Sequence, residues 1–222
     1  MKKPFVTDQM TAQGRQIEQD SFGIVDQEVG AHLYEPDQWQ LVRRMIHATA
    51  DFEFNGLTQF SSTAAQAGIQ AILSGAPVVA DVEMICVGLS KPRLAHFGVK
   101  TYQFISDEDV IQEAKKVGST RAIQAMKKAH RLGLIDGAII GVGNAPTALL
   151  EILRLIQDEG AKPALVIGMP VGFVSAAESK AATASQCPVP WVVTQGRKGG
   201  STLVVSALHA LLSLAEKQPE GV

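Results

Sequence analysis

The sequence contains little cysteine, no excess of charge of one sign and no long hydrophobic run. Its 222 residues include 2 cysteines, Cys86 and Cys187, whose spacing fits neither a metal motif nor the disulfide framework of a secreted protein. The formal net charge of −2 excludes a global basic field for nucleic acid or an acidic membrane surface. No apolar run approaches membrane-spanning length, and no apolar signal core follows residues 1–5. We therefore expect a cytoplasmic protein with no nucleic-acid, membrane or metal-ion partner.

The sequence does contain enough apolar material for a sizeable core, because 46% of its residues are hydrophobic. Residues 1–75 are predicted to be mostly helical, including a helix that begins at Ser61 or Ser62. Residues 76–217 alternate apolar runs with helical patterns, which is typical of βαβ units. The prediction is one α/β domain over residues 1–222: a doubly wound parallel sheet of about five strands with an N-terminal helical extension. The expected strands are residues 77–82, 100–105, 137–142, 163–167 and 189–194.

Three strand-to-helix junctions are rich in glycine: residues 141–147, 168–172 and 196–201. Because parallel strands end at one edge of a sheet, we expect these junctions to line one crevice. The last junction carries Arg197 and Lys198 directly before a helix-like run, and exposed helix amides beside two cations form an anion site. Tight packing between strand and helix would explain any one junction alone. Together the three predict a large anionic ligand.

Neither common nucleotide motif is complete in this chain. Residues 141–146 begin like a dinucleotide fingerprint but lack its third glycine, and residues 196–201 do not have the P-loop spacing. Nucleotide binding is therefore disfavoured. A methyltransferase that uses S-adenosylmethionine is disfavoured for the same reason.

His47 is predicted near the end of a helix, where a structural and a catalytic role are both open. Nearby Arg43 would favour the neutral ring, whereas Asp51 would favour the imidazolium. Asp81 and Glu83 follow the first strand, where two acids could bind a metal ion or orient a donor. A helix cap by Asp81 is the alternative.

Two further pairs have equally plain alternatives. Thr120 and Arg121 lie at the predicted start of a helix. Either Thr120 caps this helix and Arg121 is solvated, or the pair contacts a ligand. Glu178 and Lys180, one helical turn beyond Gly172, predict a surface salt bridge.

Taken together, these pieces resemble the precorrin-8X methylmutases, a family that includes cobalt-precorrin-8 methylmutases. The matching motifs occur in the same order and lie at residues 44–48, 81–84, 120–121, 143–149, 168–180 and 196–201. The resemblance runs from about residue 17 to the last helix and implies a flavodoxin-like fold and a homodimer. It implies an isomerase of cobalamin biosynthesis that moves a methyl group from C-11 to C-12 of precorrin-8X or cobalt-precorrin-8. The product would be hydrogenobyrinic acid or cobyrinic acid, with no cofactor required.

The resemblance places the catalytic histidine at His47, as a general acid that hydrogen bonds to or protonates a ring nitrogen. Arg121 would pair with a peripheral carboxylate of the tetrapyrrole polycarboxylate. The apolar residues Met84, Met169, Val171 and Phe173 would cover the face of the macrocycle. The expected substrate-binding residues are Ser21, Met84, Arg121, Asn144, Thr147, Gly172, Arg197, Lys198, Gly199, Gly200 and Ser201.

One departure from the family pattern is Ala50, at a position where glycine often stands. Another is residues 12–15, where an Asp-Pro or Asp-Gly turn is usual. The alternative function is a non-catalytic corrinoid-binding or carrier protein of the same fold, which would bind its ligand without converting it. Whether the substrate carries cobalt stays open at this point.

Overall fold

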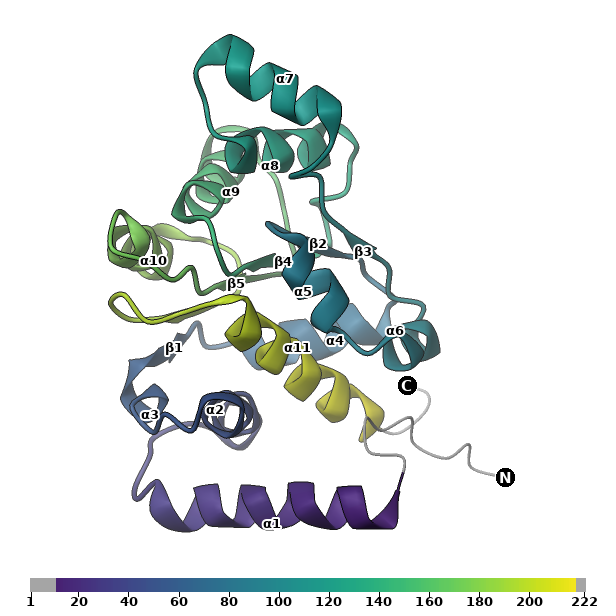
Figure 1. Ribbon diagram of the computed structural model, residues 1–222, viewed down its shortest axis with the longest axis vertical. Coiled ribbons are helices and arrows are strands. Elements are labelled where there is room, and N and C mark those ends of the chain that lie inside the picture. Colours follow the sequence, from purple (N-terminus) through teal and green to yellow (C-terminus); the bar gives the residue numbers. More distant parts are fainter. Residues whose placement is uncertain (1–10, 219–222) are drawn as a thin grey trace.

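The computed structural model describes residues 11–218, and its centre is a six-stranded sheet of order β1-β6-β5-β4-β2-β3 (Figure 1). The strands are β1 (Thr58–Phe60), β2 (Val78–Ala80), β3 (Thr101–Tyr102), β4 (Ile139–Val142), β5 (Leu165–Gly168) and β6 (Trp191–Thr194). All neighbouring pairs are parallel except β1 and β6. Strand β2 lies between β3 and β4, so the order in which strands are added to the sheet reverses there, as in doubly wound sheets. The predicted α/β fold is confirmed, with β1 added as an antiparallel edge.

Alternate residues of the central strands face two separate hydrophobic cores. Val78 and Ala80 of β2 belong to one buried cluster, and Val79 between them belongs to the other. Strand β4 divides in the same way between Ile139 and Ile140. Helices α4 and α11 cover one face of the sheet, and α8 and α9 cover the opposite face (Figure 1). The apolar runs in the sequence therefore reflect strands that are buried on both sides.

The helices of the described residues match the predicted pattern except for the short helix α3 and the two short helices near residue 90. They are α1 (Ala12–Glu28), α2 (Pro36–Thr49), α3 (Phe54–Leu57), α4 (Ala64–Leu73), α5 (Glu83–Gly88), α6 (Lys91–Phe97), α7 (Glu108–Val117), α8 (Arg121–Arg131), α9 (Pro146–Asp158), α10 (Ala176–Gln186) and α11 (Ser201–Glu216). Helices α3, α5 and α6 were not predicted, because segments of 4, 6 and 7 residues are too short to display a helical period. None of the helices formed by residues 11–218 is both long and apolar enough to cross a membrane.

Of the N-terminal part, residues 1–10 lie outside the described residues, and residues 11–75 are mostly helical but also contribute β1. This strand was missed because it has three residues, of which only Thr58 is fully buried, so it shows no alternation. The prediction that Ser61 or Ser62 caps α4 is wrong. The cap position is Thr63, whose side chain makes no capping bond, and Ser61 Oγ accepts the Trp191 amide at 2.9 Å. Helix α2 packs on α11, and α1 packs on α2.

Helix α2 ends at Ala50, which adopts a left-handed conformation with φ 52° and ψ 29°. This conformation is unfavourable for an L-residue with a Cβ and accounts for the glycine expected here from the family pattern. We expect Ala50→Gly to raise the free energy of unfolding by about 0.5–1 kcal/mol, measured in urea. Ala181→Gly, at an exposed position inside α10, is the matched control and should lower it by a similar amount, about 0.5–1 kcal/mol. An Ala50→Gly protein less stable than the parent would contradict this account.

Candidate functional site

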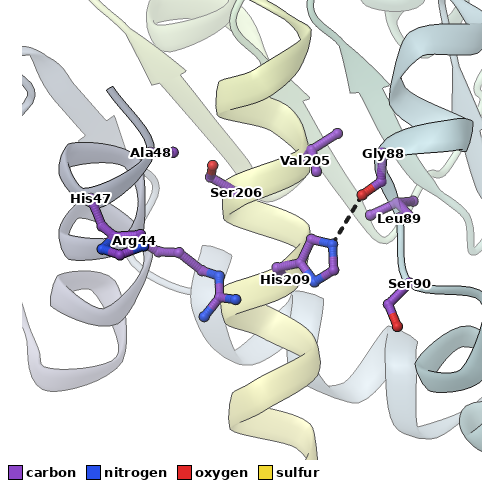
Figure 2. Close-up of a pocket in the computed structure, with 9 residues that line it drawn as sticks. All are labelled: Arg44, His47, Ala48, Gly88, Leu89, Ser90, Val205, Ser206 and His209. Carbon is purple, nitrogen blue, oxygen red and sulfur yellow. Dashed lines mark hydrogen bonds between the residues drawn. The ribbon is translucent and has the colours of Figure 1, made fainter. Parts of the chain in front are cut away.

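A cleft of about 500 Å³ opens beside His47 (Figure 2). It lies between α2, α11 and the junction of α5 with α6, and it is lined by Arg44, His47, Ala48, Gly88, Leu89, Ser90, Val205, Ser206 and His209. Helix α2 presents His47 and Arg44 from one side, and α11 presents His209 from another. The cleft thus brings two histidines from distant parts of the sequence into one site.

Helix α1 supplies the immediate neighbours of the His47 ring. Ser21 Oγ lies 2.9 Å from His47 Nδ1, and the Phe22 ring centroid lies 4.9 Å from that of the imidazole. The sequence had predicted that Ser21 lines the site, and the structure places it against the catalytic candidate. With Nδ1 engaged by a hydroxyl, Nε2 is the ring nitrogen left to meet a ligand.

Burial lowers the pKa of His47 below its ordinary value of 6.5. Arg44 lowers this pKa further, and Glu18 partly offsets both effects. The expectation that Arg43 and Asp51 control the ring is wrong, because both form ion pairs with other residues. The relevant charges come from the adjacent position on α2 and from α1, which sequence spacing alone could not show.

His209 on the opposite wall is held by hydrogen bonds at both ring nitrogens. Its Nδ1 lies 3.3 Å from an Arg93 guanidinium nitrogen, and its Nε2 lies 3.1 Å from the Gly88 carbonyl oxygen (Figure 2). Arginine only donates, so Nδ1 accepts and the Nε2 proton is given to Gly88. Arg93 is buried and forms an ion pair of 2.8 Å with Glu216. His209 therefore shapes the cleft, and His47 is the histidine that can act on a ligand there.

Asp81 is fully buried and organises the first glycine junction. Its carboxylate accepts the amides of Gly143, Asn144 and Ala145 at 3.0, 2.9 and 2.7 Å. These bonds hold the loop that precedes α9, so Asp81 acts as a cap, though for a helix distant from it in sequence. Glu83 is exposed, and no cluster of three or more metal-ligating side chains occurs among residues 11–218.

The three glycine junctions meet at one edge of the sheet, as predicted. The Gly200 amide donates to the Met169 carbonyl at 2.8 Å, and the Gly172 amide donates to the Arg197 carbonyl at 3.2 Å. A Cβ on Gly143 would lie 2.6 Å from Ser201 Cα, so a side chain there has no room. The loops are thus packed backbone against backbone, which requires glycine at Gly143.

The cations of the third junction have partners of different kinds. Lys198 forms ion pairs with Asp51 at 2.5 Å and Glu53 at 3.0 Å, which joins this loop to the segment that follows α2. The Arg197 guanidinium lies 5.4 Å from the centroid of the Phe173 ring.

The predicted surface salt bridge between Glu178 and Lys180 is wrong. Lys180 is 1% exposed, and its ammonium binds the Lys198 carbonyl oxygen at 2.7 Å. A lysine in the middle of a helix carries no sequence signal for such burial, and its partner lies in another loop.

The remaining predicted contacts occupy the same edge of the sheet. Thr147 Oγ1 lies 3.2 Å from Thr120 Oγ1, which also caps α8 by accepting the Ile123 amide. Arg121 and Asn144 are exposed beside them. Met84, Val171 and Phe173 are exposed by 58%, 48% and 84% and are open to a ligand or a partner. Met169 is fully buried in the core, so the expectation that it covers the macrocycle is wrong.

Comparison with known proteins identifies the family to which this chain belongs. A model of the family described as precorrin-8X methylmutase matches residues 16–214. The chain belongs to this family. It is 52% identical to the cobalt-precorrin-8 methylmutase of Leptospira interrogans over 217 residues, which is 96% of this chain and 99% of the relative. It is 50% identical to the cobalt-precorrin-8 methylmutase of Priestia megaterium, over 93% of this chain and 91% of the relative. The crystal structure of a precorrin-8X methylmutase from Thermus thermophilus superposes with a TM-score of 0.84 at 53% identity, covering 90% of this chain and 98% of that one.

Membership of the precorrin-8X methylmutase family confirms that the chain is an isomerase of cobalamin biosynthesis. Within this methylmutase the predicted site residues form two groups. His47 lines the cleft and Ser21 lies within hydrogen-bond distance of its ring, whereas the glycine loops lie at the end of the sheet. Helix α11 connects the groups, because it starts at Ser201 and lines the cleft one to two turns later. A large ligand in the cleft therefore has donors within reach along α11.

We expect Ser21→Ala to lower kcat of this methylmutase by about tenfold, because the hydroxyl that fixes His47 Nδ1 is lost while the ring remains. The measurement is the initial rate of product absorbance at saturating substrate. Ser185→Ala is the matched control, since its hydroxyl bonds only within the exposed face of α10. A Ser21→Ala enzyme with the kcat of the Ser185→Ala control would show that Ser21 does not orient the ring.

Proposed function

We propose that this methylmutase acts on cobalt-precorrin-8, moving the C-11 methyl group to C-12 to give cobyrinic acid. The names of the relatives with 52% and 50% identity support the cobalt form as the substrate. The observation that carries the proposal is His47, which lines the cleft beside Arg44 and contacts the Ser21 hydroxyl from the neighbouring helix. The cobalt belongs to the substrate in this scheme.

In the proposed reaction His47 Nε2 gives a proton or a hydrogen bond to a ring nitrogen next to the migrating methyl group. The bond from the methyl carbon to C-11 breaks as the bond to C-12 forms, so the transfer is intramolecular and needs no external donor. Ser21 keeps the imidazole in one orientation at Nδ1. Anionic substrate in the cleft raises the pKa of His47 from its lowered value and so favours the acid form.

The substrate carboxylates are proposed to bind at the glycine loops. Arg197 and the amides before α11 offer donors, and Ser201 Oγ is buried without a hydrogen-bond partner among the described residues. Arg121, exposed at the start of α8, is proposed to bind another carboxylate. The roles of Met84, Asn144, Thr147, Gly172 and Lys198 in substrate binding also remain predictions.

We further propose that the protein is a homodimer in the cytoplasm and that its helical N-terminal part and α/β core act as one domain. Large exposed apolar side chains near the glycine loops, Phe173 at 84% and Val174 at 82%, support a self-association surface. The free thiols Cys86 and Cys187 fit a reducing compartment. The packing of α11 on α2 and the pairing of β1 with β6 support one domain. Sedimentation of the purified protein tests the dimer.

The test of the function is an anaerobic absorbance time course in which the protein is mixed separately with cobalt-precorrin-8 and with metal-free precorrin-8X, without other cofactors. Conversion of the cobalt substrate to the cobyrinic acid spectrum is the expected result. Conversion of the metal-free substrate alone would overturn the cobalt assignment. A shifted but static spectrum with both substrates would indicate a corrinoid carrier and overturn the enzymatic role.

A further inference from the structure

Lys180 on α10 is a buried cation that has no anionic partner in the described part of the chain. Its ammonium Nζ donates to the Lys198 carbonyl oxygen at 2.7 Å and to Thr194 Oγ1 at 3.3 Å, and the residue is 1% exposed. Within residues 11–218 it forms no ion pair with a carboxylate. Buried charges are costly unless they are compensated. The Lys180 ammonium is hydrogen bonded only to one peptide carbonyl and one hydroxyl, both of which are neutral. Its positive charge is therefore not neutralised, and it lies on the interior side of the third glycine junction.

The Lys198 carbonyl belongs to the peptide that joins Lys198 to Gly199. The same oxygen also accepts the Thr194 hydroxyl at 2.8 Å, so two donors fix it toward the interior. The chain has no cis peptide in its described part, and in a trans peptide the C=O and N–H point in opposite directions. The Gly199 amide therefore points away from Lys180. It donates to no other group among residues 11–218.

A second polar group near this amide also lacks a partner. Ser201 Oγ is buried and makes no hydrogen bond with the described residues, although most buried hydroxyls are bonded. Gly200 lies between Gly199 and Ser201, and Arg197 precedes Gly199 by two residues. The Gly199 amide and the Ser201 hydroxyl of this junction are thus unbonded donors, whereas the Lys198 carbonyl oxygen accepts two hydrogen bonds on the interior side.

We propose that Lys180 is a positioning residue for substrate binding: its ammonium fixes and polarises the Lys198–Gly199 peptide from behind, so that the outward Gly199 amide binds a substrate carboxylate more strongly. Hydrogen bonds in series strengthen one another, and a cation in a low-dielectric interior acts strongly over short distances. The proposal rests on the proposed function, because it requires a polycarboxylate at the glycine loops.

The other charged groups near the Lys198 carbonyl are bound elsewhere or exposed, and Lys180 is the cation that contacts this carbonyl. Lys198 is paired with Asp51 and Glu53. Arg197 stacks on Phe173. On α10 itself Glu178 is exposed, and on the neighbouring α9 Glu151 is bound by Arg154. The residues of β6 and β1 that line the pocket beside the lysine, Val193, Thr194 and Gln59, are all uncharged.

Burial lowers the pKa of Lys180 to about 8, so its charge disappears between about pH 7 and pH 9. The pKa of His47 is shifted below this window, whereas burial moves the pKa values of Cys86 and Cys187 above 9.0. The affinity for a polycarboxylate should therefore fall across the window as the ammonium loses its proton.

The experiment measures the Kd of cobyrinic acid by absorbance titration from pH 6.5 to pH 9, for the parent, Lys180→Met, Lys180→Arg and Thr194→Val. The parent Kd should rise about tenfold across this range, and at pH 7 Lys180→Met should bind about tenfold more weakly with no further rise. Lys180→Arg keeps the charge and should restore most of the affinity. Thr194→Val keeps the ammonium and should retain the pH dependence. At saturating substrate kcat of Lys180→Met should stay within about threefold of the parent, so that the loss appears in KM.

A folded Lys180→Met protein with the parent Kd at pH 7, or with the parent pH dependence, would overturn the proposal. If Lys180→Met does not fold, the parent and Thr194→Val decide, because a Kd that is constant between pH 7 and pH 9 also overturns it. Failure of the parent to convert either corrin precursor would refute the proposed function instead. The Kd titrations measure binding alone, so their outcome does not depend on whether the protein converts a substrate.

Discussion

Replacing His47 with alanine should abolish the rearrangement while leaving product affinity within about tenfold of the parent. A general acid contributes about 10²–10⁴-fold to a rate, and the other histidine of the cleft, His209, is not placed to replace it, because both of its ring nitrogens are already bonded. The cleft and the glycine loops would remain, so binding should persist. The measurement pairs single-turnover absorbance with a product titration on the same preparation.

His130→Ala is the matched control for this experiment. His130 is another partly exposed helical histidine, and it binds Glu159 at 3.2 Å on the opposite side of the sheet from α2. It should turn over like the parent. A His47→Ala enzyme with the rate of the His130→Ala control would remove His47 from the mechanism.

The pH dependence of the parent should carry the signature of His47. The acid form is required, so kcat/KM should fall as pH rises through the pKa of the free enzyme, which burial and Arg44 hold below 6.5. Polyanionic substrate raises this pKa, so kcat should fall at a higher pH than kcat/KM. A profile of kcat/KM that rises with pH through this range would show that the neutral ring is the active form.

The sequence was sufficient for those features that depend on local pattern. Apolar runs bounded by glycine and proline predicted all five parallel strands, and Pro146 and Thr120 marked the starts of α9 and α8. The glycine junctions were predicted to meet because parallel strands end at one edge, and hydrogen bonds between them confirm this. Their spacing also carried the family resemblance.

The features that were missed depend on contacts between distant segments. Strand β1 is a strand because β6 pairs with it, and its three residues give no pattern of their own. The charge environment of His47 depends on Glu18 from α1, which spacing along α2 cannot reveal. Lys180 appeared to be a surface residue because lysine usually is, and only the fold shows the carbonyl that it binds.

The second large effect is expected from Gly199→Ala. A Cβ at this position would lie 2.7 Å from the Pro170 carbonyl oxygen and still closer to that of Met169, and both are backbone atoms that cannot rotate away. The φ angle of Gly199 lies outside the left-handed region, so the variant tests mainly the steric contact. We expect the free energy of unfolding to fall by about 3 kcal/mol and the product Kd to rise at least about tenfold, as the loops are forced apart.

Gly68→Ala separates this effect from the general cost of adding a methyl group. Its Cβ would also be crowded, at 2.8 Å, but by methyl groups of Leu211 and Leu165 that can shift, and helix α4 gains from alanine. Its loss of stability should be below about 1.5 kcal/mol, with the parent Kd. Urea unfolding and product titration give both quantities for each variant. If Gly199→Ala matched Gly68→Ala in both, the close approach of the two loops would not be what makes glycine necessary, and the carboxylate site would tolerate a side chain at its centre.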